Sequence, residues 1–229
     1  MATPIRILSS MATKALLADL VARYPAAAEV DVELISVGGV EAARRVEAGE
    51  AMDIVVLAAN VIDQLTGKER LVAGSRTDIV QSGVAIAVRQ GEPAVDISSE
   101  ASVKAAILAA RSIGYSTGPS GVYLAKLFDR WGITEQIKDR IVLAPPGVPV
   151  GAFMAKGEVD LGFQQLSELM PIEGITILGP MPPSIQLMTT FSGGIAASST
   201  QPDAARALLD YMVSADTAGI KQDNGMEPA

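Results

Sequence analysis

The stretch Ile5-Arg6-Ile7-Leu8-Ser9-Ser10-Met11-Ala12-Thr13 begins as an apolar strand and runs into a turn of hydroxyl side chains. The same order, a strand followed by a glycine- or hydroxyl-rich turn and an amphipathic helix, occurs at residues 32–39 and 112–121. Helix amino termini expose unpaired backbone N–H groups and a partial positive charge. Several such turns meeting in one place would hold a small anion without a cationic side chain.

Strand-like and helix-like segments alternate along the whole chain, which predicts an α/β protein with mostly parallel sheets flanked by helices. The predicted strands cover residues 5–8, 30–35, 54–58, 112–115, 141–144, 161–164 and 175–178. The predicted helices cover residues 14–24, 40–48, 60–66, 99–110, 120–131, 151–156, 166–170 and 202–213, the last closing the chain. The proline-rich residues 179–183 are expected to be irregular, because proline lacks a ladder donor.

Two β-rich runs, residues 79–89 and 185–197, exceed the usual strand length of about five or six residues. They are interpreted as an outbound and a return crossing between two lobes, so that the second lobe is inserted into the first. The predicted first lobe comprises residues 1–83 and 192–229, and the second comprises residues 84–191. The ligand cleft is expected between them.

Composition excludes several classes of protein. The 229 residues are 49% hydrophobic with a formal net charge of −8, which argues against nucleic-acid binding because phosphate contacts need clustered Lys and Arg. Zero histidines and zero cysteines remove the Ser-His-Asp arrangement, thiolate nucleophiles, most zinc sites and iron–sulfur ligation. We therefore expect no cofactor and no metal.

The distribution of apolar residues along the chain indicates in which compartment the protein is expected. No apolar run reaches the roughly 20 residues that span a bilayer, so no membrane insertion is expected. The start Met1-Ala2-Thr3-Pro4-Ile5 lacks the basic and apolar regions of a secretory leader. The protein is expected to be a monomer, periplasmic if a leader has been removed and cytoplasmic otherwise.

The turns supply most of the candidate ligand-binding residues. Ser120 is the expected N-cap of the helix that follows the third turn, and Gly118 and Gly121 are expected to leave space for a ligand atom. The alternatives are that the serines only cap helices, that the glycines only make turns and that the glutamines face solvent. Arg44, Arg45 and Arg111 either reach a carboxylate ligand or pair with nearby acids, and Asp53 is interpreted as a strand-end cap. The candidate set is Ser9, Ser10, Met11, Thr13, Gly38, Gly39, Tyr115, Ser116, Thr117, Ser120, Gly121, Val148, Gln164 and Gln165.

A family resemblance is carried by five segments: the opening stretch and residues 42–49 (AARRVEAG), 52–56 (MDIVV), 118–123 (GPSGVY) and 157–162 (GEVDLG). With the order of elements, they resemble the type II periplasmic solute-binding proteins, most closely the molybdate-binding branch. The resemblance implies two α/β lobes, a two-strand hinge and Venus-flytrap closure around an anion held by neutral donors. It also implies an ABC permease as partner.

Three positions depart from the molybdate-binding pattern. Where the molybdate binders have a serine in the first turn, this chain has Ala12, and where their second turn is rich in serine, it has Val37-Gly38-Gly39. Their tyrosine after the Leu-Gly strand corresponds to a position near Gln165. Because glycines enlarge the site and glutamines suit planar groups, a small carboxylate is the preferred ligand over a tetrahedral oxyanion.

Three functions are weighed. The leading hypothesis is a small-anion receptor of the ABC-transporter type with no catalytic residue. The alternative is an organic-acid isomerase resembling aconitate isomerase, which shifts a double bond in a tricarboxylate, with Tyr115 as proton carrier. An effector-binding domain of a transcription factor ranks last, because no DNA-binding helix pair or basic segment precedes Pro4.

Overall fold

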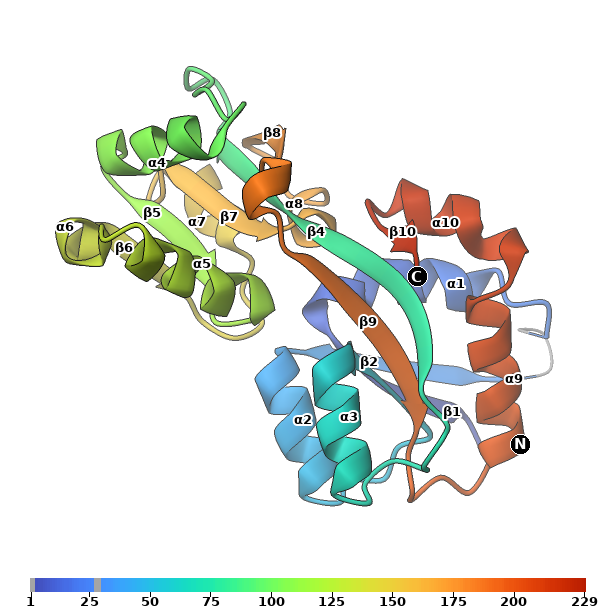
Figure 1. Cartoon of the computed structure of the whole chain (residues 1–229). Helices are drawn as coiled ribbons and strands as arrows, with labels where there is room; N and C mark the ends of the chain where they lie inside the picture. Colours follow the sequence, from blue (N-terminus) through green and yellow to red (C-terminus); the bar gives the residue numbers. More distant parts are fainter. Residues whose placement is uncertain (1–2, 27–29) are drawn as a thin grey trace. The chain divides into compact units, whose positions relative to one another are not determined.

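The computed structural model describes residues 3–26 and 30–229. The chain forms two compact units, which we call lobe 1 (Met1–Ser82 with Thr189–Ala229) and lobe 2 (Gly83–Met188). Figure 1 labels the helices and strands of both. The α/β class and the mostly parallel, helix-flanked sheets expected from the sequence are confirmed.

The sheet of lobe 1 has the strand order β2-β1-β3-β9-β4. Strands β1 (Ile5–Ser10), β2 (Val32–Val37) and β3 (Ile54–Ala58) are parallel, and β9 (Met188–Ile195) runs antiparallel to β3. The long strand β4 (Thr77–Arg89) enters lobe 2, and β10 (Glu227–Pro228) pairs antiparallel with its first half. The carboxyl ends of β1 and β2 therefore lie at one edge.

Helices cover both faces of the lobe 1 sheet, because successive strand side chains alternate between faces. Ile7 belongs to a core with α1 (Lys14–Ala22), α9 (Pro202–Met212) and α10 (Ala218–Asp223). Its neighbour Leu8 belongs to a separate core with α2 (Gly39–Glu47) and α3 (Ala59–Gly67). Helices α2 and α3 lie side by side in Figure 1.

The sheet of lobe 2 has the order β4-β7-β5-β6, and β8 (Ile175–Pro180) also pairs with β4. Strands β5 (Ile113–Ser116), β6 (Ile141–Ala144) and β7 (Leu161–Gln165) are parallel to one another. Strand β7 is antiparallel to the second half of β4. The carboxyl ends of β5, β6 and β7 thus share one edge of this sheet.

Two cores also flank the lobe 2 sheet. One contains Phe163 and the apolar faces of α4 (Glu100–Ala109), α5 (Pro119–Arg130) and α6 (Thr134–Ile137). The other contains alanines of β4 with α7 (Val150–Ala155) and α8 (Leu166–Leu169). Gln164 follows Phe163 in β7, so its side chain faces α7 and α8.

Two expectations about the chain's later part are wrong. Residues 179–183 are not wholly irregular: β8 continues to Pro180 opposite Ala85, and Pro183–Ile185 forms a 3₁₀ turn. The register shifts between Ile86 and Ala87, and such a bulge accommodates residues that cannot continue the ladder. Helix α9 does not close the chain, because α10 and β10 follow it.

Candidate functional site

The first two predicted turns come together in lobe 1. In the parallel pairing of β1 with β2, Ser9 lies opposite Ser36 and Ser10 opposite Val37. Gly38 is the N-cap of α2 and Gly39 its first residue. A Cβ atom placed on Gly39 would lie 3.8 Å from the Cβ of Ser10. Ser10 therefore lies beside the amino terminus of a nine-residue helix.

Most hydroxyls near these two turns of lobe 1 already form hydrogen bonds within the protein. Ser9 Oγ and Ser36 Oγ are 2.8 Å apart and hydrogen bonded. Thr13 Oγ1 donates to the carbonyl oxygen of Ser10 at 3.3 Å, and Thr13 is buried. Met11 opens the 3₁₀ turn between β1 and α1. These contacts indicate that Ser9 and Thr13 shape the turn.

Ser10 is different, because its Oγ is buried without a hydrogen-bond partner and the residue is only 7% exposed. An unsatisfied buried hydroxyl costs about 1–3 kcal/mol, so native structures rarely keep one without a reason. Ser10 also does not cap the 3₁₀ turn that follows it, since its side chain makes no capping bond. Its hydroxyl therefore keeps unused hydrogen-bonding capacity next to the amino terminus of α2.

The remaining predicted segments come together at the carboxyl edge of the lobe 2 sheet. Tyr115 lies between Leu143 and Phe163 in the register of β5 with β6 and β7. Ser116 ends β5 opposite Ala144, and its Oγ accepts from the N–H of Gly118 at 3.3 Å. Thr117 and, in the loop after β6, Val148 are both exposed.

The start of α5 corrects two expectations. Its N-cap is Gly118 rather than Ser120, because Pro119 occupies the first helical position, where its missing N–H is not needed. Ser120 lies inside the first turn and is buried. A Cβ on Gly121 would lie 1.6 Å from the carbonyl oxygen of Ser116. The space at Gly121 is thus filled by the backbone and not left for a ligand.

Tyr115 does not fit the role of proton carrier well. Its ring lies in the core of lobe 2, edge-on to Phe128 with ring centroids 5.8 Å apart. Burial raises the pKa of the Tyr115 phenol, which makes the basic phenolate form harder to reach. The ring is better explained as core packing.

The glutamine pair at the end of β7 is buried, which excludes the solvent-facing alternative. Gln164 Oε1 accepts from the backbone N–H of Val150 at 2.7 Å, and Gln164 Nε2 donates to Glu168 Oε1 at 2.8 Å. Sequence reasoning missed Glu168. The signal was present, because Glu168 is the lone acid in the apolar segment Leu166-Ser167-Glu168-Leu169-Met170.

The three candidate arginines are paired with acids. Arg44 binds Glu41, Arg45 binds Glu50 and Arg111 binds Asp160. Within residues 3–26 and 30–229, no group of three or more acidic side chains is placed to hold a metal ion. Neutral donors, rather than arginines or a metal, dominate both groups of candidate residues.

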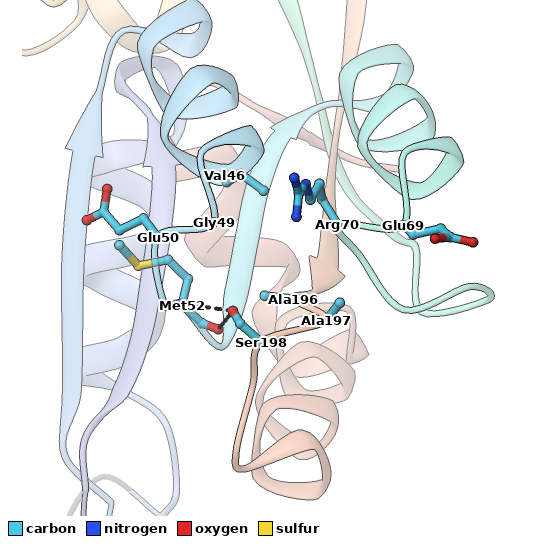
Figure 2. A pocket seen from close by; sticks show the side chains of 9 residues that line it. All are labelled: Val46, Gly49, Glu50, Met52, Glu69, Arg70, Ala196, Ala197 and Ser198. Carbon is cyan, nitrogen blue, oxygen red and sulfur yellow. Dashed lines mark hydrogen bonds between the residues drawn. The ribbon is translucent and has the colours of Figure 1, made fainter.

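A separate pocket lies in lobe 1 near the amino end of β3 and encloses about 320 Å³, part of it open solvent. Figure 2 shows Arg70 on one side of it and Ser198 beside Met52. Ser198 Oγ donates to the carbonyl oxygen of Met52 at 3.3 Å. The pocket is lined by none of the predicted site residues and lies at the end of β3 away from the turns.

Comparison with known proteins places these features in context. Residues 5–227 match the family model described as bacterial extracellular solute-binding protein. An aconitate isomerase from Pseudomonas sp. is 38% identical over 234 aligned residues, covering 99% of this chain and 88% of the relative.

Solved structures agree on the fold. The periplasmic molybdate-binding protein of Azotobacter vinelandii superposes with a TM-score of 0.81 at 16% identity, covering 98% of this chain and 99% of that one. A sulfate-binding protein from Mycobacterium tuberculosis gives a TM-score of 0.79 at 15% identity, covering 100% and 88%. Among the described residues, no helix is both long and apolar enough to cross a membrane.

Proposed function

Since the chain belongs to the bacterial extracellular solute-binding proteins, we propose that it binds a small organic di- or tricarboxylate with neutral hydrogen-bond donors. The observation that carries the proposal is the buried, unpartnered Oγ of Ser10 beside the amino terminus of α2. A carboxylate oxygen would accept from this hydroxyl and be favoured by the partial positive charge of the helix end.

The chemistry of the neighbouring groups supports a carboxylate over a tetrahedral oxyanion. Ala12 supplies no hydroxyl, and Gly38 and Gly39 supply only backbone N–H groups. Gln165 ends β7 at the carboxyl edge of lobe 2, where a planar amide matches a planar carboxylate. The paired arginines leave ligand binding to dipoles rather than to fixed positive charge.

In this proposal the ligand lies between the lobes, which close over it as hinged units. Closure would exclude water and strengthen every hydrogen bond to the ligand, because the local dielectric falls. Family membership supports a periplasmic location and delivery of the ligand to an ABC permease.

A thermal-shift screen tests the ligand class. At a concentration 100 times the Kd, a ligand adds about 2.7 kcal/mol, which corresponds to a Tm increase of about 5–10 °C for a chain of this size. We expect such increases with citrate, cis-aconitate or trans-aconitate. Increases with molybdate, tungstate or sulfate alone would contradict the carboxylate assignment.

A second function is favoured by one observation, the 38% identity to an aconitate isomerase over almost the whole chain. In this alternative the bound tricarboxylate loses a proton from a carbon next to a carboxylate, and the double bond shifts by one position as a proton returns at the other end. Proton NMR of either aconitate isomer incubated with the protein in D₂O decides between the two. Conversion with deuterium incorporation indicates the isomerase, and unchanged spectra indicate a receptor.

A further inference from the structure

Glu168 lies at the same edge of lobe 2 as the predicted ligand-binding turn. Strand β7 runs parallel to β5, and Leu161–Phe163 pair with Ile113–Tyr115. Glu168 follows the carboxyl end of β7 by three residues, in the short helix α8, and is half-buried. In open α/β sheets, ligands bind outside the carboxyl ends of parallel strands.

Gln164 fixes the position of the Glu168 carboxyl. The N–H of Val150 donates to Gln164 Oε1, so the orientation of the amide is set by a donor that cannot be reversed. The amide nitrogen must then face Glu168 Oε1, at 2.8 Å. Within the described part of the chain, Glu168 forms no ion pair and Gln164 is its one hydrogen-bond partner.

Among the described residues, no charged group contributes to the pKa shift of the Glu168 carboxyl; burial and the Gln164 hydrogen bond do. Helix α8 packs on β7 and α7, whose sequences LGFQQ and VGAFMA contain no ionisable side chain. The first charged residues after α7 and after α8, Lys156 and Glu173, are exposed. Burial raises the pKa of the Glu168 carboxyl to about 7, although the hydrogen bond from Gln164 opposes the change. The group therefore changes its protonation near neutral pH.

We infer that Glu168 is a ligand-binding group that takes up one proton when a carboxylate binds and then donates its O–H to a carboxylate oxygen of the ligand. This inference rests on the proposed carboxylate ligand. Two ionised carboxylates repel each other at hydrogen-bond distance, whereas a carboxylic acid and a carboxylate share a strong, short hydrogen bond. Glu168 thus acts as a further neutral donor and needs no cation.

The expected pH dependence follows from linkage. Well below pH 7 Glu168 is protonated in the free protein, so the affinity is at its plateau. Above pH 7 binding must take up a proton, and the affinity falls as pH rises. Between pH 7.5 and 8.5, where ordinary ligand carboxyls are fully ionised, the Kd for trans-aconitate should rise roughly five- to tenfold.

Isothermal titration calorimetry with trans-aconitate at pH 7.5 and 8.5, in two buffers of different ionisation enthalpy, tests the inference. Wild-type protein should take up close to one proton per ligand at pH 8.5. Glu168→Gln, a permanently neutral side chain of the same shape, should take up none and change Kd less than twofold between the two pH values. Glu173→Gln, which neutralises an exposed carboxylate of the same lobe, should behave like wild type.

The outcomes separate the inference from the proposed function. Tight binding by wild type without proton uptake, or unchanged proton uptake in Glu168→Gln, overturns the role of Glu168 and leaves the carboxylate ligand standing. Absence of binding by trans-aconitate, citrate and cis-aconitate at every pH overturns both. Because proton uptake is measured on wild-type protein, the inference can be contradicted even if Glu168→Gln does not fold.

Discussion

Asp53 holds three segments of lobe 1 together. Its carboxylate accepts from the N–H of Arg6 at 2.9 Å and from Ser199 Oγ at 2.6 Å. Its backbone N–H donates to Arg6 O, and its backbone carbonyl accepts from Ala196 N–H. Asp53 is 6% exposed and precedes β3. It therefore acts as the strand-end cap expected from the sequence.

Replacing Asp53 tests this role. Asp53→Ala leaves the N–H of Arg6 and the hydroxyl of Ser199 without their acceptor, so the free energy of unfolding should fall by about 2–4 kcal/mol. Asp139→Ala, at an exposed position, should change it by less than about 0.5 kcal/mol. Urea titration followed by circular dichroism measures both. Equal stability of the two variants would show that Asp53 is not a cap.

Glu168 gives a second prediction at the scale of the residue. Its folded-state pKa of about 7 lies above the ordinary glutamate value of about 4.3, so the folded chain binds the proton more tightly than the unfolded chain. The stability of wild type should therefore decline as pH rises from about 4.3 through 7, relative to Glu168→Gln. Tm measured from pH 5 to 8.5 should show a growing advantage for the variant, which levels off above pH 8. A constant difference across this range would contradict the raised pKa.

At the scale of the element, the contact of α5 with β5 decides the shape of the lobe 2 turn. Gly121 lies so close to the Ser116 carbonyl that any side chain would displace the helix. A Cβ on nearby Gly118 would instead lie 3.4 Å from Ser116 Oγ and could be accommodated. The two glycines therefore differ sharply in what they permit.

The pair makes a matched test. Gly121→Ala should lower the free energy of unfolding by about 3 kcal/mol, because the backbone contact must open. Gly118→Ala should cost about 1 kcal/mol or less, since only a helix N-cap changes. Chemical denaturation of the two variants measures the difference. Comparable losses would mean that Gly121 is not needed for close packing.

The elements were predictable because their signals are local. The apolar run Ile54–Ala58 and the strand Ile141–Ala144 have the bounds that the sequence predicts. The partners of side chains were not predictable, because they come from distant segments. Ser9 and Ser10 look alike in sequence, yet Ser36 satisfies Ser9, whereas Ser10 Oγ has no partner among the residues that the structure describes. Glu168 likewise becomes unusual only when β7 and α7 surround it with apolar groups.

At the scale of the whole molecule, the chain passes from lobe to lobe at residues 82–83 and 188–189. Next to these crossings, Gln186 clamps β4 with its side chain. Its Oε1 accepts from the N–H of Val84 and its Nε2 donates to the carbonyl of Val84, both at 3.0 Å. The Gln186 side chain thus bonds both backbone groups of Val84, close to the point where β4 passes from lobe 1 into lobe 2.

Removal of the clamp should loosen β4 locally. In Gln186→Ala the N–H of Val84 loses its acceptor, so its hydrogen exchange should be about tenfold faster, equivalent to about 1.4 kcal/mol of protection. Gln136→Ala, which removes an exposed side chain of lobe 2, should leave it unchanged. Hydrogen–deuterium exchange of the peptide that contains Val84 gives the result. Unchanged exchange would show that the clamp contributes nothing to strand order.

Ser10 and Ser214 carry the two buried unpartnered hydroxyls of the described chain, and only Ser10 lies in a candidate ligand turn. Calorimetric titration of Ser10→Ala and Ser214→Ala with trans-aconitate at pH 7 tests the central claim most directly. A hydrogen bond to a charged group contributes about 1.5–3 kcal/mol, so Ser10→Ala should weaken binding about 10- to 100-fold. Ser214→Ala should bind within about twofold of wild type. Wild-type affinity in Ser10→Ala would contradict the account.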